Sequence, residues 1–237
     1  MPAATRRVAI VTGASRGLGE ALAAGLAREG WSLVIDARTA DDLAGVAERL
    51  SGFTEVVPLA GDVTDPGHRS RLVRAAAELG GLDLLVNNAG TLGPSPLPAL
   101  TGAPLDGLRE ALEANLVAPL ALIQAAAGLL EASERPVVLN ITSDASVEAY
   151  EGWGVYGATK AALDHLSRVL AAERPRWRVW AVDPGDMRTR MHHDAFPDED
   201  ISDRPEPSAV VPSLLALVCS DRPSGRVRAS DLAGVPA

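Results

Sequence analysis

A doubly wound α/β fold is predicted for this 237-residue sequence: a single domain, residues 1–237, with a parallel sheet of about seven strands flanked by helices. Three features predict it. Most strand-like runs are apolar without polar alternation, as in strands covered on both faces. Helix-like segments stand between many of these runs, as parallel crossovers require. A glycine-rich loop separates the first run from the first helix, and such sheets bind ligands at the carboxyl ends of their strands.

The predicted strands are short and are bounded by polar or turn-forming residues. We expect them at Val8–Val11, Leu33–Ile35, Glu55–Leu59, Leu82–Val86, Val137–Ile141, Val179–Val182 and Gly225–Arg228. We expect helices from the glycine-rich loop to about Arg28, and at Pro66–Leu79, Pro104–Leu130, Val155–Glu173 and Ser208–Cys219. Pro66 suits the first turn of its helix, because the N–H that proline lacks has no helical partner there. The polar, proline-rich segment Asp186–Pro207 is expected to be a mobile substrate lid.

The composition excludes several classes of protein. Hydrophobic residues make up 47% and charged residues 22%, which excludes a disordered chain. The formal net charge of −9 offers no electrostatic footprint for nucleic acid or an anionic membrane. The single cysteine, Cys219, cannot form an internal disulfide or a cysteine-rich metal site, and we expect it to be a small core residue.

The sequence also predicts a cytoplasmic protein. Residues Met1–Arg7 contain no apolar core of a signal peptide. The most apolar stretch, Leu116–Leu130, includes Pro119 and Gln124 and is interpreted as too short to span a bilayer.

The rare residues are more informative than the common ones. The chain has one lysine, Lys160, against 21 arginines, and its two tyrosines are Tyr150 and Tyr156. An ammonium is a compact point charge and a guanidinium a broad fork, so the two cations are not interchangeable. The only lysine, four residues after one of the two tyrosines, therefore indicates a chemical role for that pair.

The loop Thr12–Gly19 stands between the first strand and the first helix. Gly13 permits a tight turn, and Gly17 and Gly19 allow close approach of the backbone to a ligand and of the helix to the sheet. The helix N-terminus behind such a loop is a site for a pyrophosphate. A turn without a ligand is the alternative, but the position near the N-terminus favours nucleotide binding.

Tyr156 and Lys160 are four residues apart at the start of a predicted helix and so share one face. A neighbouring ammonium is expected to lower the pKa of the phenol toward the operating pH. Ser143 follows the strand Val137–Ile141 closely, where its hydroxyl can reach a substrate oxygen or cap the loop. Asn115 lies in an apolar helix and needs a hydrogen-bond partner, so a structural and a functional role stay equally open.

Taken together, these motifs resemble the short-chain dehydrogenase/reductase family over nearly the whole chain. The motifs, in order, are Thr12-Gly-Ala-Ser-Arg-Gly-Leu-Gly19, Asp62-Val63, Asn87-Asn-Ala-Gly90, Asn115, Ser143, Tyr156-x-x-x-Lys160 and Pro184-Gly-Asp-Met-Arg-Thr189. The resemblance implies one Rossmann domain that binds a nicotinamide cofactor.

The resemblance also implies the catalytic residues. Tyr156 would give a proton to a carbonyl oxygen as hydride arrives from the cofactor, or take it back in the reverse direction. Ser143 would hold that oxygen. Lys160 would bind the nicotinamide ribose, and Asn115 would hold a water that relays protons to Lys160.

The implied cofactor site draws on the loops after several strands. Besides Tyr156 and Lys160, its members are Gly13, Ser15, Arg16, Gly17, Leu18, Gly19, Arg38, Asp62, Val63, Asn88, Ala89, Gly90, Pro184, Gly185, Met187 and Thr189. Among them, Asp62 and Val63 would contact adenine, and the Pro184–Thr189 segment would hold the nicotinamide amide.

NADP(H) is expected in preference to NAD(H). Asp36 is 23 residues after Gly13 and invites the NAD interpretation, since an acid near this distance binds the ribose hydroxyls. The family's acidic position, however, falls on Ala37, and strand alternation turns Asp36 to the other face. Arg38 and Arg16 then suit a 2′-phosphate.

Other candidate residues receive weaker assignments. Tyr150 and Trp153 are interpreted as substrate walls, because they lie between Ser143 and Tyr156. We expect no metal site: His192-His193-Asp194 looks like a ligand cluster but stands in a flexible segment where the side chains cannot easily converge. His68 and His165 are expected on helix surfaces.

The sequence therefore predicts an NADPH-dependent carbonyl reductase, or alcohol dehydrogenase in reverse, acting on a small molecule. An NAD-dependent alcohol dehydrogenase and a catalytically idle NADP-binding regulator or scaffold are the alternatives. A homodimer or homotetramer is expected, because the Pro104–Leu130 helix is apolar on much of its circumference.

Overall fold

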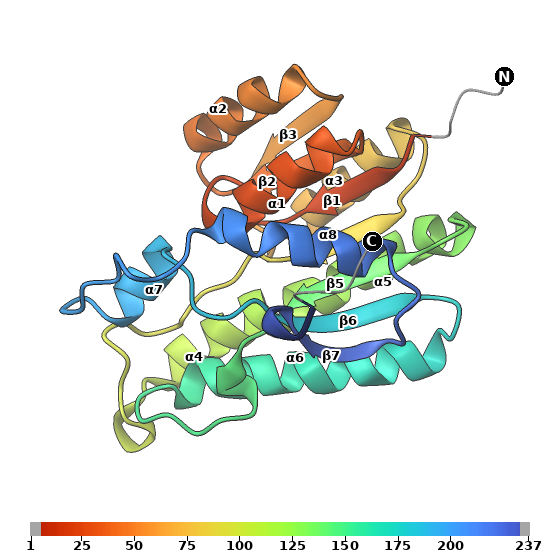
Figure 1. Ribbon diagram of the computed structural model, residues 1–237. Helices are drawn as coiled ribbons and strands as arrows, with labels where there is room; N and C mark the ends of the chain where they lie inside the picture. Colours follow the sequence, from red (N-terminus) through yellow and green to blue (C-terminus); the bar gives the residue numbers. More distant parts are fainter. Residues whose placement is uncertain (1–5, 233–237) are drawn as a thin grey trace, which may run out of the picture.

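Seven parallel strands form the centre of the computed structural model, which describes residues 6–232 (Figure 1). In the order β3-β2-β1-β4-β5-β6-β7, they are Val56–Ala60, Ser32–Ala37, Val8–Val11, Leu84–Asn87, Val137–Ile141, Arg178–Asp183 and Gly225–Arg228. The predicted parallel sheet is confirmed. The strand order reverses between β1 and β4, and this reversal opens a crevice at the carboxyl edge of the sheet. Residues 1–5, part of the segment interpreted as lacking a signal peptide, lie outside the described residues.

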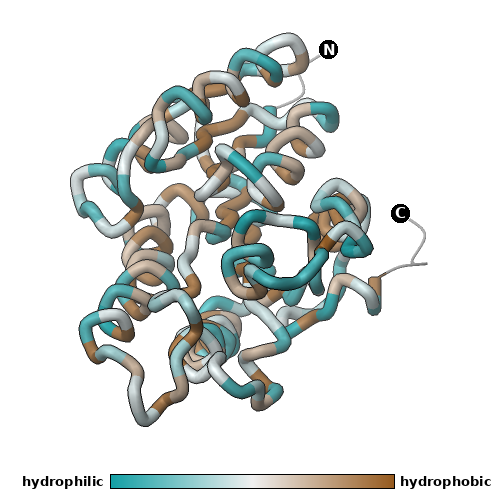
Figure 2. The backbone as a smooth tube through the Cα atoms, turned by 90° about the vertical axis from the view of Figure 1, so that its left-hand side faces the viewer, coloured by the Kyte–Doolittle hydropathy of each residue, from teal (hydrophilic) through white to brown (hydrophobic). Residues whose placement is uncertain are grey.

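Two layers of helices cover the sheet (Figure 1). One face carries α1 (Gly17–Arg28), α2 (Ala40–Ser51) and α8 (Val211–Cys219). The other carries α3 (Pro66–Glu78), α5 (Ala118–Ala132) and α6 (Gly154–Glu173), with α4 (Leu105–Leu112) beside α6. A short helix, α7 (Arg190–Ala195), lies at the carboxyl edge within the polar segment that was predicted as a lid. Figure 2 faces this end of the molecule, and hydrophilic colour predominates in the coiled segment near the centre of the view.

The predicted helices agree with the structure except at α2, α7 and one long segment. The helix α2 was not predicted, although its buried residues Leu43, Val46, Ala47 and Leu50 follow the helical spacing. The single helix expected over Pro104–Leu130 is interrupted by a π-helical turn, Glu113–Val117. Turns of this kind are frequent at functional sites.

The apolar segment Leu105–Ala132 is long and apolar enough to cross a membrane by length and composition, so the interpretation that the stretch is too short was wrong. Its place in the fold gives a better reason for its apolar character. Leu122, Ala126 and Leu130 belong to the core between this helix and the sheet. Val117 and Leu120 remain exposed on the side away from that core.

Cys219 is exposed, which corrects the expectation of a core residue. It is the last residue of α8, and the buried side of that helix is formed by Leu214, Leu217 and Val218. A cysteine at the helix end thus falls on the solvent side of the same apolar segment.

Candidate active site

A cavity of about 1750 Å³ runs along the carboxyl edge of the sheet. Its walls come from the segments that follow β1 to β6 and from the start of α6. Nearly every residue assigned to a site from the sequence lines it. Within residues 6–232 the exceptions are Gly19 and Asn115, which lie behind the wall. The fold thus brings distant parts of the sequence to one site.

The glycine-rich loop is packed tightly against the loop after β4. Gly13 has φ +65°, and a Cβ there would stand 2.9 Å from the Cα of Ala89. A Cβ on Gly19 would overlap the carbonyl oxygen of Gly13. The side chain of Asn88 donates to the carbonyl of Thr12 at 2.8 Å. Only glycine fits at these two positions, which accounts for the loop sequence.

At the end of β2, consecutive residues point to opposite faces, as alternation predicts. Ala37 belongs to the core under α1 and α2. Asp36 instead reaches α3 on the other face, where its Oδ2 lies 3.0 Å from His68 Nε2. Arg38 is exposed and lines the cavity. Hydrogen bonds from Thr64 lower the pKa of Asp62, and the positive charge of Arg38 lowers it further. Arg16 pairs with Asp42 at 2.9 Å.

His68 is fully buried, so its assignment to a helix surface was wrong. Its ring fills the space beside Gly61, and Asp36 lies 1% exposed next to it. Asp36 Oδ1 also accepts a 2.8 Å hydrogen bond from Gly13 N. Burial raises the pKa of Asp36, and the hydrogen bond with His68 opposes that shift. His68 therefore supports the glycine-rich loop through Asp36. His165 is exposed, as expected.

Tyr156 and Lys160 are both buried at the start of α6, one turn apart. Lys160 Nζ lies 5.5 Å from the centre of the Tyr156 ring and donates to the carbonyl oxygen of Ile141 at 2.8 Å. This bond fixes the lysine to the end of β5. The helical pair predicted from the sequence therefore faces the cavity together.

The electrostatics of the pair differ from the expectation. Burial raises the pKa of Tyr156, and the negative charges of Asp144 and Asp183 raise it further, while a hydrogen bond with Ser143 lowers it. The pKa is therefore raised, not lowered as predicted from the neighbouring Lys160, and desolvation is the largest cause of the shift. Burial also lowers the pKa of Lys160 to about 8. At neutral pH the phenol is protonated, as is a tyrosine of ordinary pKa.

Ser143 follows β5 and is half-buried in the cavity wall. Its hydroxyl donates to Asp144 Oδ1 at 2.9 Å. The other oxygen of Asp144 accepts from the Tyr150 hydroxyl, also at 2.9 Å. Asp144 was not singled out in the sequence, and only its position next to Ser143 could have indicated it.

Asn115 occupies the π-helical turn and is completely buried. Its side chain pairs with both backbone groups of Thr91, at 2.8 Å each, and donates to the hydroxyl of Thr159 at 2.9 Å. These bonds satisfy the amide and join the loop after β4 to α6. Asn115 therefore has the structural role that the sequence alone left as one of two possibilities.

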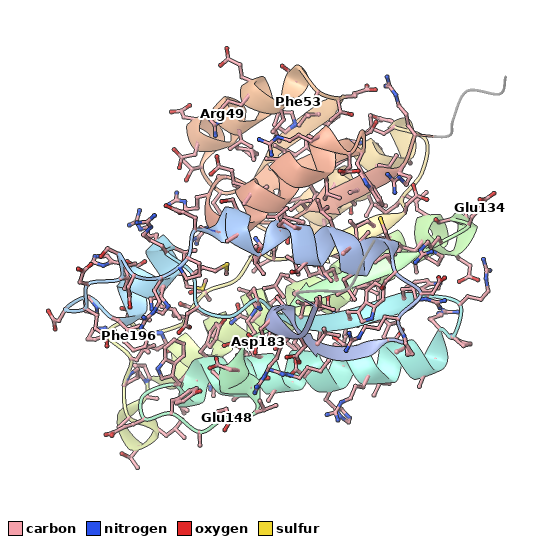
Figure 3. The ribbon with its side chains drawn as sticks, in the orientation of Figure 1. Arg49, Phe53, Glu134, Glu148, Asp183 and Phe196 are labelled. Carbon is pink, nitrogen blue, oxygen red and sulfur yellow. The ribbon has the colours of Figure 1, made fainter. Side chains whose placement is uncertain are left out.

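Aromatic side chains form the far end of the cavity. Trp153 meets the Tyr156 ring edge-on, with centroids 5.6 Å apart, and lies 5.6 Å from the ring of Phe196. Figure 3 shows Phe196 beside α7, in the segment predicted as a lid. The rings of His192 and Phe196 lie 5.0 Å apart and are tilted by 44° to each other. Phe196 was missed in the sequence because no spacing connects it to the other site residues.

Known proteins share this chain's sequence pattern. The family model for short chain dehydrogenases matches residues 7–200. A 3-oxoacyl-[acyl-carrier-protein] reductase of rhamnolipid biosynthesis from Pseudomonas aeruginosa is 38% identical over 193 residues, 78% of this chain and 74% of that protein. Sepiapterin reductase from Mus musculus is 36% identical over 197 residues, 78% and 76% of the two chains.

The fold is also found among solved structures. A short chain dehydrogenase from Shigella flexneri, complexed with NADP, superposes with a TM-score of 0.88 at 28% identity. The match covers 94% of this chain and 97% of the other.

Replacing His68 with leucine is expected to lower the free energy of unfolding by about 3–5 kcal/mol, because Asp36 would stay buried without its imidazole partner. Denaturant unfolding measures the change. The matched control is His165→Leu on exposed α6 surface, expected to change stability by less than about 0.5 kcal/mol. Equal stability of the two variants would show that the Asp36–His68 contact does not support the loop.

Proposed function

The chain belongs to the short-chain dehydrogenase family of NAD(P)-dependent oxidoreductases, and we propose that it reduces a carbonyl group to an alcohol with NADPH, or catalyses the reverse. The observation that carries this proposal is the convergence of Ser143, Tyr156 and Lys160 on one cavity. Two of the similar proteins are named as reductases, which supports the reductive direction.

The cavity suits a dinucleotide. Within residues 6–232, no side chain caps the N-terminus of α1. Gly17 and Leu18 of its first turn line the cavity, and so does Ser15 in the loop just before the helix. Helix N-termini of this kind bind phosphate groups. We assign Asp62, Val63 and the Asn88–Gly90 loop to the adenosine half and the channel, and Pro184, Gly185, Met187 and Thr189 to the nicotinamide end. The bound cofactor would supply the hydride.

Tyr156 is the proposed proton donor. Its hydroxyl is protonated near neutral pH, as in any tyrosine whose pKa is ordinary or raised, and this is the form that reduction of a carbonyl requires. We assign the Ser143 hydroxyl to hold the carbonyl oxygen. Lys160 would hold the ribose and assist the return of a proton to Tyr156, and Asn115 would place a relay water near it.

Preference for NADP(H) is proposed from the end of β2. Asp36 is occupied by Gly13 and His68, so it is poorly placed to receive ribose hydroxyls. Arg16 and Arg38 both line the cavity, where a 2′-phosphate would meet two guanidinium groups. The NADP complex of the Shigella protein supports the same choice.

Further features of the proposal concern the substrate and the assembly. Tyr150 and Trp153 would wall a small carbonyl or alcohol substrate, and residues 186–207 would close over it. We propose a single domain over residues 1–237 in a cytoplasmic enzyme without a nucleic acid, membrane or metal partner. A homodimer or homotetramer is supported by Val117 and Leu120, which expose apolar surface on the helical layer.

Tyr156→Phe is expected to lower kcat for carbonyl reduction by about a hundred- to ten-thousand-fold, because only the proton-donating hydroxyl is lost. NADPH affinity, measured by fluorescence titration, should stay within about twofold, since the buried ring remains. Tyr150→Phe removes a hydroxyl from the proposed substrate wall and not from the proton donor, so it should affect KM more than kcat. A Tyr156→Phe enzyme with more than about a tenth of the wild-type kcat would contradict the assignment.

NADPH is expected to exceed NADH in kcat/KM by at least about a hundredfold, with roughly 1.5–3 kcal/mol from each arginine. The double variant Arg16→Leu/Arg38→Leu should lose this preference while its kcat with NADH is maintained. Arg74→Leu, an exposed arginine on α3, is the control and should change neither value. Preference of the wild type for NADH would overturn the assignment of both arginines.

A further inference from the structure

Arg226, on the edge strand β7, contacts three segments that form part of the proposed active site. Arg226 donates from Nε to Asp164 Oδ2 at 3.0 Å. Its Nη2 donates to the backbone oxygen of Ser143 at 3.0 Å and to Asp183 Oδ2 at 3.1 Å. Three bonds from one planar guanidinium therefore join three separate segments.

Each of these segments carries a residue of the proposed reaction. Ser143 is held directly, through its own carbonyl group. Asp164 stands one helical turn beyond Lys160 and two beyond Tyr156, on the same side of α6. Asp183 ends β6, and its Oδ1 accepts from Gly185 N at 3.0 Å at the start of the loop assigned to the nicotinamide end. Figure 3 shows Asp183 beside the carboxyl end of the sheet.

The network is largely shielded from water. The side chains of Asp164 and Asp183 are 7% and 6% exposed, and that of Arg226 is 21% exposed. Ser146 adds a further bond to Asp164 Oδ2 at 2.6 Å, which secures the turn after Ser143. Charge-assisted bonds between fixed planar groups define geometry as well as adding stability. A cation with fewer donor directions could balance the two carboxylates without aligning all three segments.

We propose that Arg226 is a positioning residue for the reaction: it holds Ser143, the helix of Tyr156 and Lys160, and the Asp183–Gly185 turn in one fixed arrangement. The expected loss of kcat rests on the proposed function. The fixed arrangement of the three segments rests only on the contacts of Arg226. Arg226 acts through its partners.

The test separates positioning from charge balance with Arg226→Lys, which keeps the positive charge and loses the fork. Thermal unfolding should stay close to that of the wild type. Carbonyl reduction should lose about ten- to a hundredfold in kcat, because small misplacements of reacting groups have effects of this size. The affinity for NADPH should change by less than about threefold, since its phosphate contacts are remote from β7.

Hydrogen exchange followed by mass spectrometry gives a readout independent of activity. Amides of residues 143–148 and 183–189 should exchange faster in Arg226→Lys. Arg228→Lys is the matched control on the same strand: it lies 3.9 Å from Asp183 and 3.8 Å from Glu148, and its side chain is 48% exposed. It should match the wild type in exchange and in kcat.

The outcomes are distinct. Wild-type exchange and kcat in Arg226→Lys would overturn the positioning role. A wild type that reduces no carbonyl with NADPH would overturn the proposed function. In that case, faster exchange in Arg226→Lys but not in Arg228→Lys would still support the positioning role of Arg226. If Arg226→Lys does not fold, Asp183→Asn removes one carboxylate from the same link, and unchanged exchange at 143–148 and 183–189 in that variant would overturn the proposal.

Discussion

The burial of one ammonium group against the end of β5 is the constraint on which the arrangement of the site depends. Lys160 is only 4% exposed, so its charge needs a partner inside the protein. It finds the carbonyl oxygen of Ile141 at 2.8 Å, and the negative charge of Asp164 raises its pKa against the larger lowering by desolvation. This contact fixes α6 relative to the sheet and places Tyr156 at the cavity.

Other buried polar contacts at the carboxyl edge fix the neighbouring loops relative to the helices in the same way. Asn115 joins the loop after β4 to α6 through Thr91 and Thr159. Asp36 joins the glycine-rich loop to His68 on α3. The sheet interior is held by apolar packing, whereas the edge is held by buried polar groups with specific partners. Since unpaired buried polar groups are costly, each of these contacts restricts its loop to few conformations.

The fold was largely predictable from the sequence, because a parallel sheet leaves a strong signal in its apolar runs. The strands Val8–Val11 and Val137–Ile141 agree with the structure at both ends. Most of the proposed site was predictable as well, since its residues occur in motifs with fixed spacing. His68 and Arg226 were not, because their partners lie 32 to 83 residues away and only folding brings them together.

The most direct test of this account is the ionisation of Tyr156. With Tyr150 replaced by phenylalanine, Tyr156 is the only tyrosine in the chain. Its ionisation can then be followed by the tyrosinate absorbance difference against the Tyr150→Phe/Tyr156→Phe variant, with circular dichroism to confirm the fold. Because burial and the carboxylates of Asp144 and Asp183 raise the pKa, we expect no tyrosinate below about pH 10, the ordinary pKa of a tyrosine. Half-ionisation at or below that pH would contradict the conclusion that burial and the two carboxylates raise the pKa of Tyr156.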